Sequence, residues 1–94
     1  MPTVTVRIPT PLRGFTAEAD EVTVDAADVG GAIHVLNAAH PGIAARILTP
    51  EGELRPYVNL FVGTHNVRDL DGLASALREG DVIAIIPAVA GGAR

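Results

Sequence analysis

Cysteine is missing from this 94-residue sequence. The chain therefore has no disulfide framework, no cysteine-ligated zinc or iron–sulfur site and no nucleophilic thiol. Lysine is missing as well, and all seven cationic residues are arginines. A chain without lysine cannot be joined to further copies of itself through side-chain amines.

Aromatic residues and long apolar runs are also scarce. With two Phe, one Tyr and no Trp, the core must be built from Val, Ile, Leu and Ala. No apolar run approaches the ~20 residues that a membrane-spanning helix needs, and no basic and apolar leader precedes the first strand. We therefore expect a cytoplasmic protein with no membrane partner.

Charge and length limit the classes of function further. A net charge of −4 argues against a nucleic-acid partner and favours a partner with a basic docking face. A chain of this length is the size of one domain, which buries roughly 60–65% of its unfolded surface.

Two segments alternate between polar and apolar residues, as strands with one buried face do. They are residues 3–8, stopped by Pro9 and Pro11, and residues 21–25. Residues 13–20 between them have no clear period and are interpreted as a turn. The sequence thus predicts an antiparallel hairpin.

The apolar spacing then changes to steps of three and four, which predicts a helix capped by Asp28. The residues of its apolar face are Val29, Ala32, Ile33, Leu36, Ala39 and Ile43. Pro41-Gly42 should end the helix, residues 43–48 should form a short further turn, and residues 49–53 a polar loop.

The second half of the chain is again strand-like. Residues 57–62 are apolar on both faces except at Asn59, and residues 82–86 are apolar throughout, which places the last strand inside the sheet. Residues 66–68 are interpreted as a short strand and residues 70–77 as a short helical turn. This order of elements predicts an α+β fold of the β-grasp type, with the main helix on one face of a mixed sheet.

The end of the sequence differs in composition from the rest. The predicted domain covers residues 1–87, and residues 88–94 form a tail of small residues with Gly91-Gly92 near its end. Such a segment has too little apolar surface to order itself. Because glycine has no side chain, Gly91-Gly92 suits passage through a narrow channel to the active site of an enzyme.

Together, the predicted fold and this tail resemble the ubiquitin-like sulfur carriers of the MoaD/ThiS family, and within it the CysO-type carriers of cysteine biosynthesis. The resemblance spans nearly the whole chain. It is carried by the residues Ile8-Pro9-Thr10-Pro11-Leu12-Arg13, Tyr57-Val58-Asn59, Val67-Arg68, Gly72-Leu73-Ala74, Gly80-Asp81 and Ile86-Pro87-Ala88-Val89-Ala90-Gly91-Gly92.

The resemblance implies a carrier without catalytic residues or cofactors of its own. An E1-like enzyme would use ATP to adenylate Gly92 and convert it to a thiocarboxylate, with Val89, Ala90 and Gly91 recognised as the tail. A pyridoxal phosphate-dependent cysteine synthase and a zinc metallopeptidase of the JAMM type would be the further partners.

The sequence departs from the family because Ala93-Arg94 follow the second glycine, whereas mature carriers end there. We interpret the chain as a proprotein that is cut between Gly92 and Ala93, with an unprocessed pseudocarrier or a cloning remnant as alternatives. Molybdopterin and thiazole synthesis are alternative destinations for the sulfur, and conjugation to other proteins is an alternative function. A plain binding module with an inert tail is the third possibility.

Other polar residues give no pattern of a site. The histidines His34, His40 and His65 have no metal-ligand spacing, so no metal is expected. The carboxylates Glu51, Glu53, Asp69 and Asp71 lie in polar turns without apolar cover, and Arg13, Arg55 and Arg68 are interpreted as a solvated rim. Asn59 is expected to satisfy backbone groups near the tail.

One helix cannot cover both faces of the sheet. Leu60, Val62 and Ile85 are therefore the candidates for an exposed apolar surface on which the activating enzyme docks, with ordinary core packing as the alternative.

Overall fold

The computed structural model describes residues 1–87, and residues 88–94 lie outside the described part. Five strands form one mixed sheet in the order β2-β1-β5-β3-β4. The strands are β1 (Thr3–Arg7), β2 (Glu21–Asp25), β3 (Val58–Val62), β4 (His65–Asn66) and β5 (Val82–Pro87). The helices are α1 (Val29–Ala39) and α2 (Ala44–Ile47), with the short 3-10 helices η1 (Thr10–Thr16), η2 (Val67–Asp69) and η3 (Gly72–Ala74).

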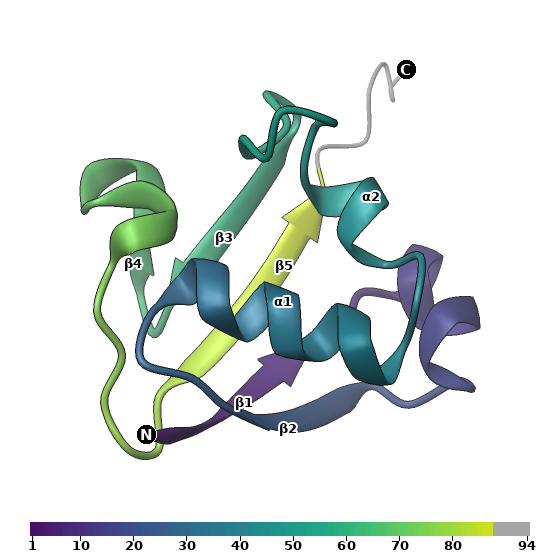
Figure 1. Ribbon diagram of the computed structural model, residues 1–94, viewed down its shortest axis with the longest axis horizontal. Coiled ribbons are helices and arrows are strands. Elements are labelled where there is room, and N and C mark those ends of the chain that lie inside the picture. The colour runs from purple at the N-terminus through teal and green to yellow at the C-terminus, as the bar shows by residue number, and fades with distance from the viewer. Residues whose placement is uncertain (88–94) are drawn as a thin grey trace.

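The predicted hairpin and the central position of the last strand are confirmed. β1 and β2 pair antiparallel from Thr3 opposite Asp25 to Arg7 opposite Glu21. β5 lies between β1, which it pairs in parallel, and β3, which it pairs antiparallel. Figure 1 shows α1 crossing one face of this sheet. The α+β fold of the β-grasp type is therefore confirmed.

The connection between β1 and β2 is not the simple turn that the sequence predicted. It contains η1, which has Pro11 near its start, where the missing amide hydrogen of proline costs nothing. Thr16 at its end is buried, and its hydroxyl donates to the Ala19 carbonyl at 2.8 Å. Ala17 and Glu18 then take positive φ values of 53° and 69°.

Helix α1 begins as the sequence predicted. The Asp28 carboxylate accepts from the Gly31 amide at 2.7 Å, which caps the first turn. The adjacent Gly30 is explained by packing: a Cβ there would lie 3.2 Å from the carbonyl oxygen of Leu73 in η3. The absence of a side chain thus lets η3 approach the helix closely.

The core lies between this helix and the sheet. Its residues are Val4, Val6, Ile8, Val24, Ala26, Val29, Ala32, Ile33, Leu36, Ile43, Ile47, Val58, Leu60, Val67, Leu77, Ile83 and Ile85. As expected, all are aliphatic. Of the predicted helix face, Ala39 is exposed because α1 ends there, and Ile43 reaches the core from the connection that follows.

Candidate functional site

The sheet fixes the place at which the tail begins. β5 ends at Pro87, which pairs with Val58 at the start of β3. The tail thus leaves from the end of the central strand, with β1 and β3 on either side (Figure 1). The candidate residues Val89, Ala90, Gly91, Gly92 and Ala93 lie outside the described residues, so the description of the site begins at this root.

The face of the sheet opposite α1 carries an apolar surface beside this root. Alternate residues of β5 face it, and they pair with residues of β3 across the strands: Ala84 lies opposite Phe61, and Ile86 lies opposite Asn59. Ile86 is 48% exposed and Val82 is 38% exposed. We call Phe61, Val82, Ala84 and Ile86 the open-face patch.

Two of the three residues predicted to form an exposed apolar surface are in the core. Leu60 is fully buried and Ile85 is 3% exposed, because both lie on the strand face that α1 covers. Val62 lies on the same face, half-buried against the core. The interpretation of Leu60 and Ile85 as exposed is therefore wrong.

The residues that lie on the open face are one position away along each strand. A signal for them was present in the sequence, because Asn59 marks the polar face of β3 and Phe61 follows it by two positions. Phe61 and Ile86 therefore belong to the face that the helix leaves open.

Asn59 makes two hydrogen bonds to other side chains. Its side-chain oxygen accepts from Asn66 Nδ2 at 3.3 Å and from Arg68 Nε at 3.2 Å. The predicted contact with backbone groups near the tail stays a prediction, because residues 88–94 lie outside the described part. Arg68 also donates through its Nη2 atom to the carbonyl oxygens of Arg55 and Val58, at 2.6 and 2.7 Å. This network ties the start of β3 and the loop before it to β4 and η2.

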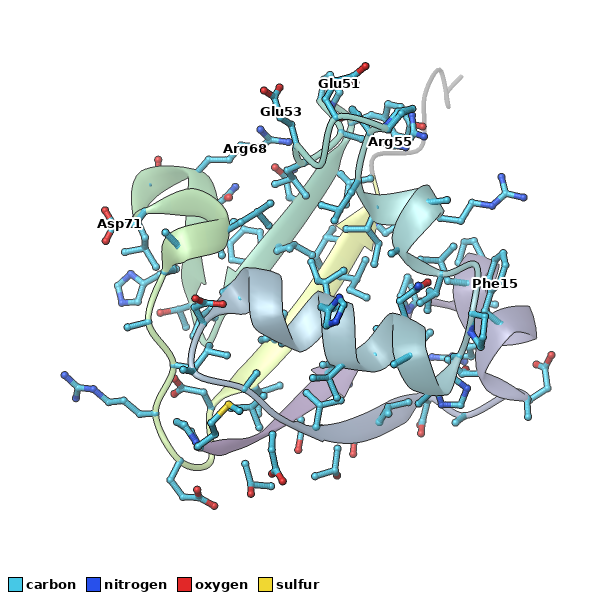
Figure 2. The ribbon with its side chains drawn as sticks, viewed as in Figure 1. Phe15, Glu51, Glu53, Arg55, Arg68 and Asp71 are labelled. Carbon is cyan, nitrogen blue, oxygen red and sulfur yellow. The ribbon has the colours of Figure 1, made fainter. Side chains whose placement is uncertain are left out.

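The arginines interpreted as a solvated rim are thus partly structural. Besides Arg68, Arg13 Nε donates to the carbonyl of Ile8 at 3.0 Å, and Arg55 Nε donates to the carbonyl of Ala45 at 3.0 Å. Figure 2 shows Arg55 and Arg68 at the end of the molecule where β5 finishes. These bonds fix the segments that surround the root of the tail.

The remaining candidate polar residues of the described part are spread over several turns and helices. Within residues 1–87, no group of three or more His, Asp or Glu side chains is placed to hold a metal ion. His34 and His65 are exposed, as are the four carboxylates Glu51, Glu53, Asp69 and Asp71. In the same residues no helix has the length and apolarity needed to cross a membrane.

Comparison with known proteins agrees with this geometry. The ThiS family matches residues 6–92, a range that includes Gly91-Gly92. Sulfur carrier protein CysO of Mycobacterium tuberculosis is 42% identical over 91 residues, which cover 95% of this chain and 98% of the relative. Small archaeal modifier protein 3 of Haloferax volcanii is 41% identical over 68 residues, covering 72% of this chain and 73% of the relative.

A solved structure extends the similarity to three dimensions. The crystal structure of the BexX/CysO complex from Amycolatopsis orientalis matches with a TM-score of 0.89 and 39% identity, covering 95% of this chain and 99% of that chain. Sequence and fold agree over nearly the whole length, and the chain belongs to the ThiS family.

Proposed function

We propose that this chain is a CysO-type sulfur carrier that is thiocarboxylated at Gly92. One observation carries the proposal: the chain is 42% identical, over 95% of its length, to a protein named a sulfur carrier. The fold supports it, because β5 ends at Pro87, at the end of the central strand and five residues before Gly92. In this proposal partner enzymes bind the folded domain, and the chemistry takes place at the tail.

The proposed chemistry needs an activated carboxylate. Hydrolysis of the Gly92–Ala93 peptide bond first releases Ala93-Arg94 and leaves a carboxylate on Gly92. This carboxylate attacks the α-phosphorus of ATP on an E1-like enzyme and displaces pyrophosphate. Sulfide then attacks the carbonyl carbon of the acyl-adenylate and expels AMP, because AMP is a far better leaving group than oxide or hydroxide. The product is a thiocarboxylate, whose sulfur is a soft anionic nucleophile.

We propose cysteine biosynthesis as the destination of this sulfur. A pyridoxal phosphate-dependent cysteine synthase would accept it, and a zinc metallopeptidase of the JAMM type would release the cysteine formed on Gly92. ATP, pyridoxal phosphate and zinc all belong to these partners. In this proposal the carrier is their substrate and not an enzyme.

We assign the docking of the activating enzyme to the open-face patch. Its members are aliphatic or aromatic, they lie on the face of the sheet opposite α1, and Ile86 is next to Pro87 at the root of the tail. An enzyme that holds the tail can therefore bury this patch at the same time.

ATP–pyrophosphate exchange tests the site. A chain that ends at Gly92 should support exchange with the activating enzyme, whereas the chain that continues through Ala93-Arg94 should not, since its glycine has no free carboxylate. A chain ending at Gly92 that carries Gly91→Ala is the matched control for tail recognition. Equal exchange by the short and long chains would refute processing between Gly92 and Ala93.

A reconstituted reaction tests the destination. The processed carrier is incubated with the activating enzyme, ATP, sulfide and the cysteine synthases of the same genome, and its mass is measured. We expect first a thiocarboxylate and then a cysteine adduct on Gly92. If the thiocarboxylate forms but no synthase of that genome uses it, delivery to a molybdopterin or thiazole precursor replaces cysteine synthesis.

A second candidate is favoured by one observation, the 41% identity to small archaeal modifier protein 3. In this alternative the activated Gly92 is joined to lysines of other proteins. The chain has no lysine, so it cannot form side-chain-linked chains of itself. Affinity purification of the tagged carrier from its own cells decides, because a modifier yields isopeptide-linked proteins that resist denaturant and reductant, and a sulfur carrier does not.

A further inference from the structure

A groove lies beside the root of the tail, on the side of the sheet that carries the helices. It has a volume of about 320 Å³ and is mainly apolar. We call it the tail-root groove, and its lining residues are Pro11, Leu12, Arg46, Tyr57, Val58, Ile85 and Pro87. They come from η1, α2, β5 and the start of β3, which are distant in sequence.

The groove and the open-face patch lie on opposite sides of one strand. In β5, Ile85 and Pro87 line the groove, whereas Ala84 and Ile86 face the other side. Pro87 is also the residue from which the tail continues. A protein that takes hold of the tail must therefore lie next to one of these surfaces.

The exposed residues of the groove are of the types that contribute most at interfaces. Tyr57 is one of only three aromatic residues in the chain, and half of it is exposed (50%) instead of packed in the core. The exposed Arg46 lies over the ring of Phe15, with 5.6 Å between its guanidinium carbon and the ring centroid. Tyrosine and arginine are the residues that, with tryptophan, dominate binding free energies.

The lining of the groove is positively charged, although the protein as a whole is acidic, because Arg46 is the one charged residue among the seven that line it. The net charge is −4, yet residues 29–50, which include α1 and α2, contain no Asp or Glu. η1, which forms another wall, contains Arg13 and no acidic residue. The only ion pair among residues 1–87 joins Arg7 and Glu21, at 3.9 Å, so Arg46 has no acidic partner there. The complementary group is a carboxylate on another protein.

We propose that the tail-root groove is a second docking surface for a protein that presents a large aliphatic side chain next to a carboxylate. The aliphatic side chain packs between Leu12 and Tyr57, and the carboxylate pairs with Arg46. This inference rests on the proposed function, in which the activating enzyme uses the open-face patch. The groove then serves the enzyme that consumes the thiocarboxylate, so the two enzymes recognise different sides of β5.

Two variants of the groove test this assignment, Arg46→Glu and Tyr57→Ala. The matched control is Arg78→Glu, which makes the same charge change at an exposed residue of the turn before β5, at the end of the strand opposite Pro87. Thiocarboxylate formation by the activating enzyme and adduct formation by the cysteine synthase from purified thiocarboxylate are measured separately. Thermal melting verifies that each variant is folded.

We expect each groove variant to raise the carrier concentration needed for half-maximal adduct formation about tenfold. The activation step should keep its half-maximal concentration, and Arg78→Glu should change neither step. Unchanged adduct formation in folded Arg46→Glu and Tyr57→Ala would overturn the inference. An equal loss in both steps would also overturn it, because the groove would not then distinguish the two enzymes.

Failure of the proposed function is visible separately, in the processed chain that ends at Gly92 and carries no other change. If that chain takes no sulfur from the activating enzyme, the sulfur-carrier proposal fails whatever the groove variants do. Calorimetric titration of the unmodified carrier with the synthase then decides about the groove. Tighter binding by the wild type than by Arg46→Glu supports a docking surface, and equal or absent binding refutes it.

Discussion

Ile85 and Ile86 are adjacent isoleucines of β5, and the structure predicts different effects when each is replaced by alanine. Ile85→Ala should mainly lower stability, and Ile86→Ala should mainly weaken activation. Ile85 is 3% exposed and belongs to the core, whereas Ile86 is 48% exposed. Replacing a buried isoleucine by alanine costs about 3 kcal/mol, because the lost methyl groups leave a cavity. At the half-exposed position we expect a cost of at most ~1 kcal/mol, mainly from lower β-propensity.

These costs translate into clearly different melting temperatures. Each kcal/mol lowers Tm by ~4–8 °C in a domain of this size, so Ile85→Ala should lower Tm by ~12–24 °C and Ile86→Ala by no more than ~8 °C. Circular dichroism melts and urea titrations measure both. At a temperature where both variants are folded, Ile86→Ala should weaken thiocarboxylate formation and Ile85→Ala should not. Equal losses of stability, or a loss of activation confined to Ile85→Ala, would refute the assignment of the two faces.

Three further predictions concern single residues and are read by thermal melting. Asp28→Ala removes the cap that accepts from the Gly31 amide and should lower the free energy of unfolding by about 1 kcal/mol. Asp28→Asn can still cap and should lower it less. Equal losses of stability in the two variants would contradict the capping role. Glu18→Gly should raise stability by ~0.5–1 kcal/mol, since φ is 69° at this residue, and a fall in Tm would show that this conformation carries no strain. Arg68→Lys should lower the free energy of unfolding by about 1 kcal/mol, because a lysine cannot donate to Asn59 Oδ1 and to the carbonyl oxygens of Arg55 and Val58 in the same geometry. An unchanged Tm would show that water replaces these bonds.

The parts of the fold that follow from local patterns were predictable from the sequence. The alternation in residues 3–8 and 21–25 predicts β1 and β2, and the spacing after Asp28 predicts α1 with its cap. These patterns depend on which side chains share a face. The repeat of two residues in a strand and of 3.6 residues in a helix sets this locally. The central place of β5 followed from its lack of polar residues.

Two features were not predictable in this way. Strand β5 is apolar on both faces and gives no sign of which face the helix covers, so Ile85 was assigned to the wrong side. On β3 the one sign is Asn59, which marks the open face, and the prediction for Leu60 was wrong although that sign was present. The bonds of Arg13, Arg55 and Arg68 to backbone carbonyls depend on the final path of loops that are distant in sequence, and no local pattern reports them.

The positions of these three arginines explain how a small domain presents its tail. Arg13 holds the carbonyl of Ile8 at the end of β1, Arg68 holds that of Val58 at the start of β3, and Arg55 ties α2 to the same region. Since β1 and β3 flank β5, these bonds hold the segments on both sides of β5 in place. The place at which the tail begins thus depends on the folded domain, whereas in the proposed function its reactivity depends on Gly92. Substitutions in the arginine network should therefore alter how well partners find the tail, and substitutions in the tail should alter transfer while the domain keeps its stability.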